Sequence, residues 1–126
     1  MSTAKEHGKR GEDAVCAYLL QAGFTVLARN YTVRGGELDL VAAKDGVLAF
    51  VEVKTRMRTR ASSKYGRPAA AITLTKWTHF RFAAECYLRE HPYAGTLRFD
   101  VAEVYLEPDG LTEVKYYASV SPKSAR

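Results

Sequence analysis

The sequence predicts an α/β fold in which a central mixed β-sheet is flanked by α-helices. Three observations favour it. Apolar spacing and turn residues along the 126-residue chain give the element order α-β-β-β-α-β-β. Two apolar runs joined by Asp45-Gly46 are typical of a β-hairpin. A second helical segment then separates this hairpin from two later strands, and a helix in that place commonly crosses the face of a sheet.

The first half of the chain predicts one helix and three strands. Residues 4–22 carry apolar side chains at three- and four-residue intervals, and Gly23 follows as a typical residue just beyond a helix. Residues 24–33 are rich in β-branched and aromatic side chains, which predicts a strand. Two further strands are expected over residues 37–43 and 47–55, on either side of the Asp-Gly turn.

The second half predicts a loop, a helix and two strands. Residues 56–67 are basic and rich in Ser, Thr and Gly, which favours a mobile loop, and a helix is expected from residue 73 or 75 to residue 91. On that helix, Trp77 is interpreted as a core anchor in preference to a base-stacking residue. Strands are expected over residues 96–106 and 111–120. We expect residues 1–120 to form one domain, followed by a polar tail over residues 121–126.

Positive charge is concentrated in one part of the chain, which has a formal net charge of +5. No acidic residue occurs from Val53 to Ala84, and a field of one sign attracts polyanions. The stretch therefore predicts a nucleic-acid partner, with a merely solvated basic loop as the alternative. Its cationic residues are Lys54, Arg56, Arg58, Arg60, Lys64, Arg67, Lys76 and Arg81.

Cysteine, histidine and hydropathy patterns limit the other classes of protein. Cys16 and Cys86 lack paired spacing and are interpreted as buried free thiols, as expected in a reducing compartment. The three histidines show no ligand spacing. The N-terminal segment lacks an apolar signal core, and no apolar run approaches the roughly 18 residues of a membrane span. We therefore expect a cytoplasmic protein without a membrane partner.

Four charged residues are expected on one side of the two hairpin strands. Because strand side chains alternate, Glu37 shares a face with Asp39, and Glu52 shares a face with Lys54. Their apolar neighbours are expected to point the other way into the core, namely Leu38, Leu40, Val51 and Val53.

The two-residue turn also predicts a register. If Lys44 faces Val47, opposite residue numbers sum to 91, so Asp39 lies opposite Glu52 and Glu37 lies opposite Lys54. Two facing carboxylates repel each other unless a cation lies between them. Mg²⁺ is suited to one or two carboxylates together with waters and a phosphate. The alternative is a ladder of salt bridges on an exposed sheet face.

A family resemblance follows from these residues and others in order. An acidic residue on one strand, followed by Glu-x-Lys on the next, resembles the PD-(D/E)xK nuclease superfamily, which has the restriction-endonuclease-like fold. To about Val104, the ordered motifs resemble the bacterial uncharacterised family UPF0102, the YraN-like proteins, which are similar to archaeal Holliday junction resolvases. The motifs are Gly11-Glu12, Arg29-Asn30-Tyr31, Gly36-Glu37-Leu38-Asp39-Leu40, Phe50-Val51-Glu52-Val53-Lys54-x-Arg56, Lys76 and Arg98-Phe99-Asp100-Val101.

The resemblance implies roles for individual residues. Asp39 and Glu52 match the metal ligands, with Mg²⁺ or Mn²⁺ as the cofactor, and Lys54 matches the catalytic lysine. Glu12 matches a glutamate of the first helix that lies beside the metal, with an exposed carboxylate near the helix start as the alternative. Glu37 is either a carboxylate that binds water beside the metal or the partner of Lys54. Leu38 stands where the superfamily has proline before the aspartate, which is not a ligand.

The leading functional hypothesis is a metal-dependent endonuclease-like protein acting on DNA, with branched or damaged structures as candidate substrates. Backbone phosphates would be held, without sequence readout, by Arg56, Arg58, Arg60, Lys64 and Arg67. One alternative is a non-catalytic nucleic-acid-binding or DNA-processing accessory module that retains the nuclease fold. Another is a protein-interaction domain whose basic face binds an acidic partner. The likeness to resolvases implies a homodimer.

Overall fold

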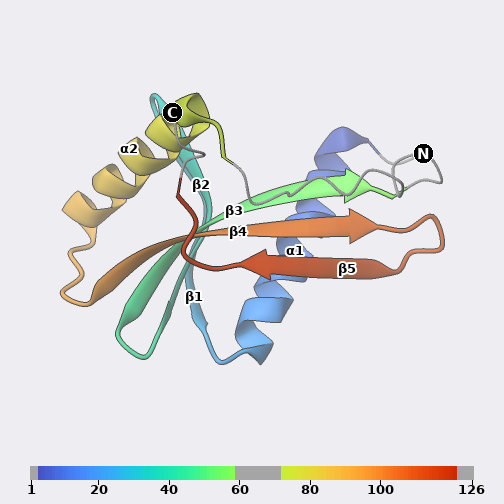
Figure 1. Ribbon diagram of the computed structural model, residues 1–126, viewed down its shortest axis with the longest axis horizontal. Coiled ribbons are helices and arrows are strands. Elements are labelled where there is room, and N and C mark those ends of the chain that lie inside the picture. The colour runs from blue at the N-terminus through green and yellow to red at the C-terminus, as the bar shows by residue number, and fades with distance from the viewer. Residues whose placement is uncertain (1–2, 59–71, 122–126) are drawn as a thin grey trace.

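A five-stranded mixed sheet lies between two helices in the computed structural model, which describes residues 3–58 and 72–121 (Figure 1). This architecture confirms the predicted α/β class and the predicted order of elements. The elements are α1 (Ala4–Gln21), β1 (Thr25–Val33), β2 (Gly36–Lys44), β3 (Val47–Met57), α2 (Leu74–Glu90), β4 (Thr96–Leu106) and β5 (Thr112–Tyr117).

The strands lie in the sheet in the order in which they occur along the chain. Strands β1, β2 and β3 form an antiparallel meander, and β4 and β5 pair antiparallel at the other edge. The pairing of β3 with β4 is parallel over eleven residue pairs, from Val47–Thr96 to Met57–Leu106. Parallel neighbours require a crossover connection, and α2 lies within this one, on one face of the sheet.

Local capping explains where both helices begin and where α1 ends. Thr3 and Glu6 form a reciprocal capping box at the start of α1, and α1 ends before Gly23, whose φ of +95° is left-handed. The side chain of Thr73 caps α2 by accepting a hydrogen bond from the amide of Lys76. Neither helix of the described residues combines the length and the apolar character needed to cross a membrane.

Two hydrophobic clusters cover the two faces of the sheet, each beneath one helix. The cluster on the α2 face includes Phe50 and Phe80, and the cluster on the α1 face includes Val15 and Val51. Trp77 is half-buried against the α2 cluster, with its ring 4.8 Å from that of Phe99. This packing confirms its prediction as a core anchor.

Some sequence-based boundaries differ from the structure. Strand β3 continues to Met57 because it pairs with β4 along its whole length, so Arg56 belongs to a strand and its prediction as part of a loop was wrong. Strand β5 ends at Tyr117, three residues before the predicted end. Most of the predicted loop lies outside the described residues, because these exclude residues 59–71. Residues 122–126 of the predicted tail also lie outside them. Both cysteines are free, as predicted, although half-buried.

Helix α1 approaches β3 closely at Gly11, which is buried. A Cβ atom built on Gly11 would lie 1.9 Å from the Thr55 Oγ1 atom and 3.0 Å from the Thr55 Cβ atom. Gly8, on the same helix, would have open space around an added Cβ. The absence of a side chain at Gly11 therefore sets the distance between α1 and the strand that carries Glu52 and Lys54.

We expect opposite effects from the same substitution at these two glycines. Gly11→Ala forces Thr55 or the helix to shift and destabilises the fold by about 1–3 kcal/mol. Gly8→Ala removes backbone freedom from the unfolded chain at a partly buried helical position that has room for a Cβ, and it stabilises the fold by up to about 1 kcal/mol. Urea unfolding of both variants tests this, and equal changes in the free energy of unfolding would contradict the close packing at Gly11.

Candidate functional site

The candidate site lies where β2 and β3 separate. The predicted register is confirmed from Lys44–Val47 to Leu40–Val51, where the pairing ends. Beyond that point, the predicted pairs of Asp39 with Glu52 and Glu37 with Lys54 were wrong, and Glu37 pairs with Thr32 of β1. The Oδ2 atom of Asp39 instead accepts a hydrogen bond of 2.7 Å from the amide of Val53. Where β2 and β3 separate, the side chain of Asp39 thus takes the place of a main-chain partner for the Val53 amide.

The strand β2 also departs from regular alternation at Asp39. Leu38 and Leu40 are both fully buried, but Leu38 belongs to the α2 cluster and Leu40 to the α1 cluster. Regular alternation would have placed both on one face, so the prediction that they share an orientation was wrong. The irregularity lies opposite Asn30, a β1 residue with a φ of +53°. The distortion turns the Asp39 side chain towards β3, where it meets Val53.

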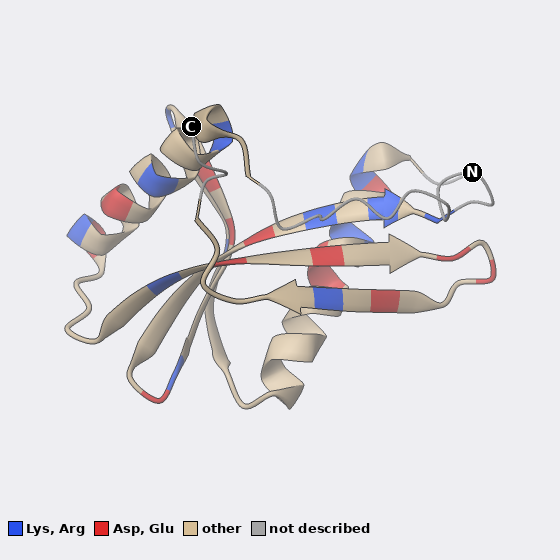
Figure 2. Cartoon of the chain, in the orientation of Figure 1, with Lys and Arg blue, Asp and Glu red and all other residues tan. Residues whose placement is uncertain are grey.

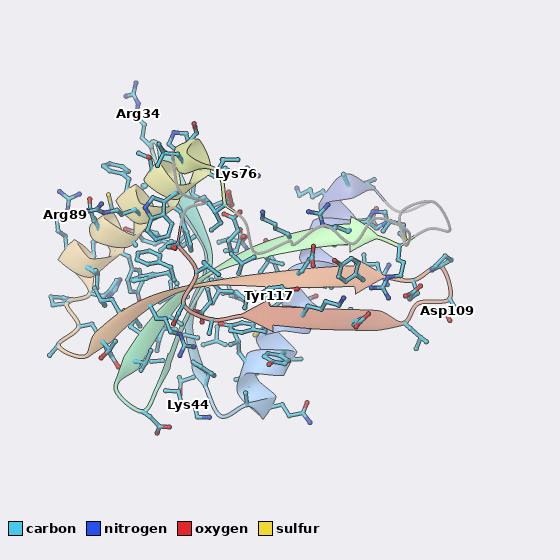
Figure 3. The ribbon with its side chains drawn as sticks, viewed as in Figure 1. Arg34, Lys44, Lys76, Arg89, Asp109 and Tyr117 are labelled. Atoms are coloured by element: carbon cyan, nitrogen blue, oxygen red, sulfur yellow. The ribbon has the colours of Figure 1, made fainter. Side chains whose placement is uncertain are left out.

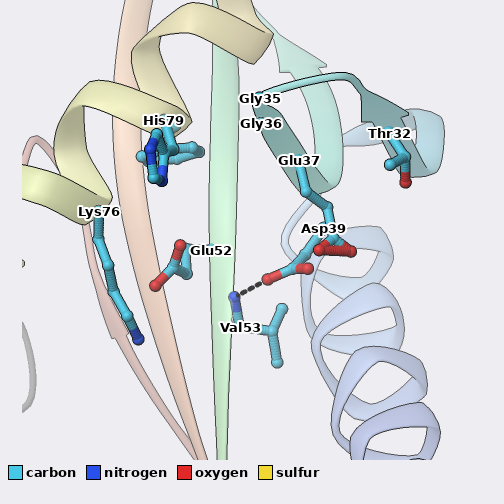
Figure 4. A pocket seen from close by; sticks show the side chains of 10 residues that line it. Thr32, Gly35, Gly36, Glu37, Asp39, Glu52, Val53, Lys76 and His79 are labelled. Atoms are coloured by element: carbon cyan, nitrogen blue, oxygen red, sulfur yellow. Dashed lines mark hydrogen bonds between the residues drawn. The ribbon is translucent and has the colours of Figure 1, made fainter.

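A cleft of about 590 Å³ brings together three of the predicted carboxylates, those of Glu37, Asp39 and Glu52 (Figure 4). Glu37 is exposed, whereas Asp39 and Glu52 are half-buried. Helix α2 supplies the opposite wall of the cleft. The remaining lining residues are Thr32, Gly35, Gly36, Val53, Lys76, His79 and Phe80.

The environment of Asp39 disfavours its charged form. Burial raises the pKa of Asp39 from 3.8 to about 7, and the neighbouring carboxylates of Glu37, Glu52 and Glu12 act in the same direction. The hydrogen bond from Val53 opposes this increase. A cation bound near Asp39 would therefore be stabilised by several negative charges.

Glu12 is near this site but does not line the cleft. Its side chain is half-buried, and one carboxylate oxygen lies 4.0 Å from the Nη2 atom of Arg29. Glu12 lies well beyond the first turn of α1, so its interpretation as a carboxylate near the helix start was wrong. Within residues 3–58 and 72–121, no three His, Cys, Asp or Glu side chains gather closely enough to hold a metal ion. The structure brings Asp39 and Glu52 to one cleft and leaves Glu12 at its margin.

Lys54 lies on the same face of β3 as Glu52, two residues further along the strand. Its side chain is half-buried. Burial lowers the pKa of Lys54, and the positive charges of Lys76 and Arg56 add to this effect, whereas Glu52 and Glu103 oppose it. The lysine therefore lies in a mixed field, between the carboxylates of the cleft and the basic residues further along β3.

The two predicted phosphate-binding arginines that the structure describes both have protein partners. The Nε atom of Arg56 donates a 3.0 Å hydrogen bond to Glu103, whose side chain is only 2 % exposed. The Nη1 atom of Arg58 lies 3.2 Å from Glu107 and 2.8 Å from Glu113. Red and blue segments accordingly lie beside one another across β3, β4 and β5 (Figure 2). The other predicted residues, Arg60, Lys64 and Arg67, lie outside the described residues.

Another charged group lies within the core, at Asp100. Its buried carboxylate accepts hydrogen bonds from the Arg98 guanidinium, the Tyr116 hydroxyl and the Ser119 amide. This confirms the interpretation of Asp100 as a structural ion pair, because every one of these partners belongs to β4 or to the segment that packs beside it.

Sequence reasoning assigned no site role to the α2 residues of the cleft, Lys76 and His79. In the sequence, Lys76 stands out only as part of the basic stretch and of the family motifs. Helix α2 begins many residues after β2 and β3. Its distance from the carboxylates therefore depends on the path of the crossover connection, which a local sequence pattern does not give. The polar pair Thr75-Lys76, between Leu74 and Trp77, is the signal that could have indicated an exposed, functional helix end.

This chain is similar in sequence to known proteins of one family over most of its length. The model of the uncharacterised protein family UPF0102 matches residues 11–104. A UPF0102 protein of Chloroherpeton thalassium is 41% identical over 108 residues, covering 85% of this chain and 81% of the relative. One from Symbiobacterium thermophilum is 43% identical over 104 residues, covering 82% and 85%. One from Syntrophomonas wolfei is 39% identical over 113 residues, covering 89% and 94%. The chain belongs to the uncharacterised protein family UPF0102.

Proposed function

We propose that this protein is a Mg²⁺- or Mn²⁺-dependent endonuclease that hydrolyses phosphodiester bonds in DNA. One observation carries the proposal. The carboxylates of Glu37, Asp39 and Glu52 converge on one cleft, and Lys54 follows Glu52 on the same face of β3. The resemblance of this arrangement to the PD-(D/E)xK nucleases supports the same reaction.

The donor set of the cleft is suited to a hard divalent cation. Carboxylate oxygens are the preferred ligands of Mg²⁺, which commonly uses one or two of them and completes its shell with waters and phosphate. Asp39 and Glu52 would hold the ion, since Val53 fixes the Oδ2 atom of Asp39 and leaves the Oδ1 atom for a ligand. When bound, the ion would supply Lewis-acid stabilisation of negative charge on the phosphate.

The protein's own groups would position the reactants of hydrolysis. A water molecule adds to phosphorus, one ester P–O bond breaks, and the leaving oxygen takes up a proton. Glu37, exposed at the mouth of the cleft, is placed to accept a hydrogen bond from that water. Lys54 would stabilise the charge that develops on the phosphate oxygens, an effect that is strong where the ammonium is partly shielded from solvent.

A cleavage assay over several DNA structures tests this function. The substrates are linear, nicked, flapped and four-way DNA, each incubated with Mg²⁺, Mn²⁺ or EDTA. We expect cleavage of at least one structure with either metal and none with EDTA. Binding without cleavage under every condition would contradict the nuclease and would favour a non-catalytic DNA-binding module.

A further inference from the structure

Lys76 occupies a position that the local energetics of α2 do not favour. It is exposed in the first turn of the helix, where Thr73 caps its amide and no acidic residue is present. The amino end of a helix carries a partial positive charge, so an ammonium group there is disfavoured. The helix alone therefore does not explain the lysine.

The side chain of Lys76 extends into the carboxylate cleft. It lines the cleft with Glu37, Asp39 and Glu52, and Figure 4 shows it on the side of Glu52 away from Asp39. Within the part of the chain that the structure describes, its ammonium makes no hydrogen bond or salt bridge. Lys54 lies two residues beyond Glu52 on β3, on the strand face that also presents Glu52 to the cleft. Two ammonium groups, from β3 and from α2, thus approach the same small region.

We propose that Lys76 is a second phosphate-binding cation, which contacts the reacting phosphodiester from the α2 side while Lys54 contacts it from β3. This inference rests on the proposed nuclease function. A second lysine also brings the formal charge of the site close to that of its proposed ligand. Three carboxylates and two lysines leave one net negative charge, and a divalent cation changes this to one positive charge. That charge matches the single negative charge of a phosphodiester.

The proposal predicts a change in the salt dependence of DNA binding. Each phosphate contact on duplex DNA contributes about −0.9 to the slope of log affinity against log salt concentration. We expect Lys76→Ala to lose about one such contact and to bind roughly tenfold more weakly at low salt. Lys76→Arg keeps the charge and should keep the slope. The melting temperature of Lys76→Ala should not fall, because a cation is removed from a helix start.

A matched control is available on the same helix. Arg89 lies at the far end of α2 from Lys76 (Figure 3), and Arg89→Ala removes the same net charge. Affinities are measured by fluorescence anisotropy over a salt series, with Ca²⁺ in place of Mg²⁺ and with the DNA checked for cleavage. We expect the Arg89→Ala slope to equal that of the parent.

The outcomes separate this inference from the nuclease function. A slope and an affinity of Lys76→Ala equal to those of the parent would overturn the phosphate contact, even if the parent cleaves DNA. An equal loss in Arg89→Ala would also overturn it, since net charge alone would then explain the change. A loss specific to Lys76→Ala in a parent that never cleaves would support the contact and overturn the nuclease. A parent that binds no DNA would overturn both.

Discussion

Replacing Lys54 with alanine is expected to lower single-turnover cleavage by about 10²–10³ while the protein still folds and binds DNA. The ammonium of Lys54 lies on the face of β3 that also presents Glu52, partly shielded from solvent. If it stabilises charge that develops only during the reaction, its loss affects the rate far more than the affinity. The proposed phosphate contact of Lys76 would remain in this variant, so DNA binding should persist.

The conservative variant separates geometry from charge. Lys54→Arg retains the positive charge but replaces a compact ammonium with a planar guanidinium, so we expect it to restore little of the rate. Melting curves, DNA affinity and single-turnover cleavage are measured on the same preparations. A Lys54→Ala variant that cleaves at the parental rate would show that this lysine has no part in the chemistry.

The second large effect concerns the stability of the metal-free protein and its dependence on pH. The pKa of Asp39 is raised from 3.8 to about 7, so between these values the folded protein binds more protons than the unfolded chain. The free energy of unfolding therefore falls as the pH rises from about 4 to 7, and the loss persists above pH 7. One pKa unit corresponds to about 1.4 kcal/mol, and the partial exposure of Asp39 reduces the net effect to on the order of 2 kcal/mol.

Asp39→Asn is expected to abolish this pH dependence. Asparagine keeps the size of the side chain and an oxygen that can accept the Val53 amide, but it removes the negative charge from the carboxylate cluster. The variant should therefore be more stable than the metal-free parent at pH 7.5, although it loses the proposed activity. Urea unfolding from pH 4 to 8 measures this.

Asp45→Asn is the matched control for that experiment. Asp45 is exposed in the turn between β2 and β3, and asparagine tolerates its φ of +50°. We expect its unfolding curves to follow those of the parent across the pH range. A destabilised Asp39→Asn at pH 7.5 would mean that the Asp39 carboxylate supports the fold and does not strain it.

Local sequence signals predicted the hairpin that carries the site. Asp45 and Gly46 both adopt positive φ values, +50° and +77°, as the two-residue turn requires. This turn fixes the register of β2 and β3 as far as Leu40 and Val51. The alternation of apolar and charged residues then correctly places Glu52 and Lys54 on one face of β3.

The geometry beyond that point depends on contacts that no local pattern encodes. The side chain of Asp39 competes with the main chain for the Val53 amide, while β3 is held along its whole length by the parallel strand β4. Extrapolating the hairpin therefore gave a wrong pairing for the two carboxylates. The presence of Lys76 in the cleft likewise depends on how α2 crosses the sheet, and Gly36 permits that crossing because an added Cβ would lie 2.3 Å from the carbonyl oxygen of His79.

Titration of the protein with Mn²⁺ by calorimetry tests most directly whether the carboxylate cleft is a metal-dependent site. We expect one saturable site in the parent at pH 7.5. That site is lost in Asp39→Asn and in Glu52→Gln and is retained in Asp45→Asn. Mn²⁺ binding that is unchanged in both cleft variants, or absent from the parent, would contradict the assignment of Asp39 and Glu52 as metal ligands.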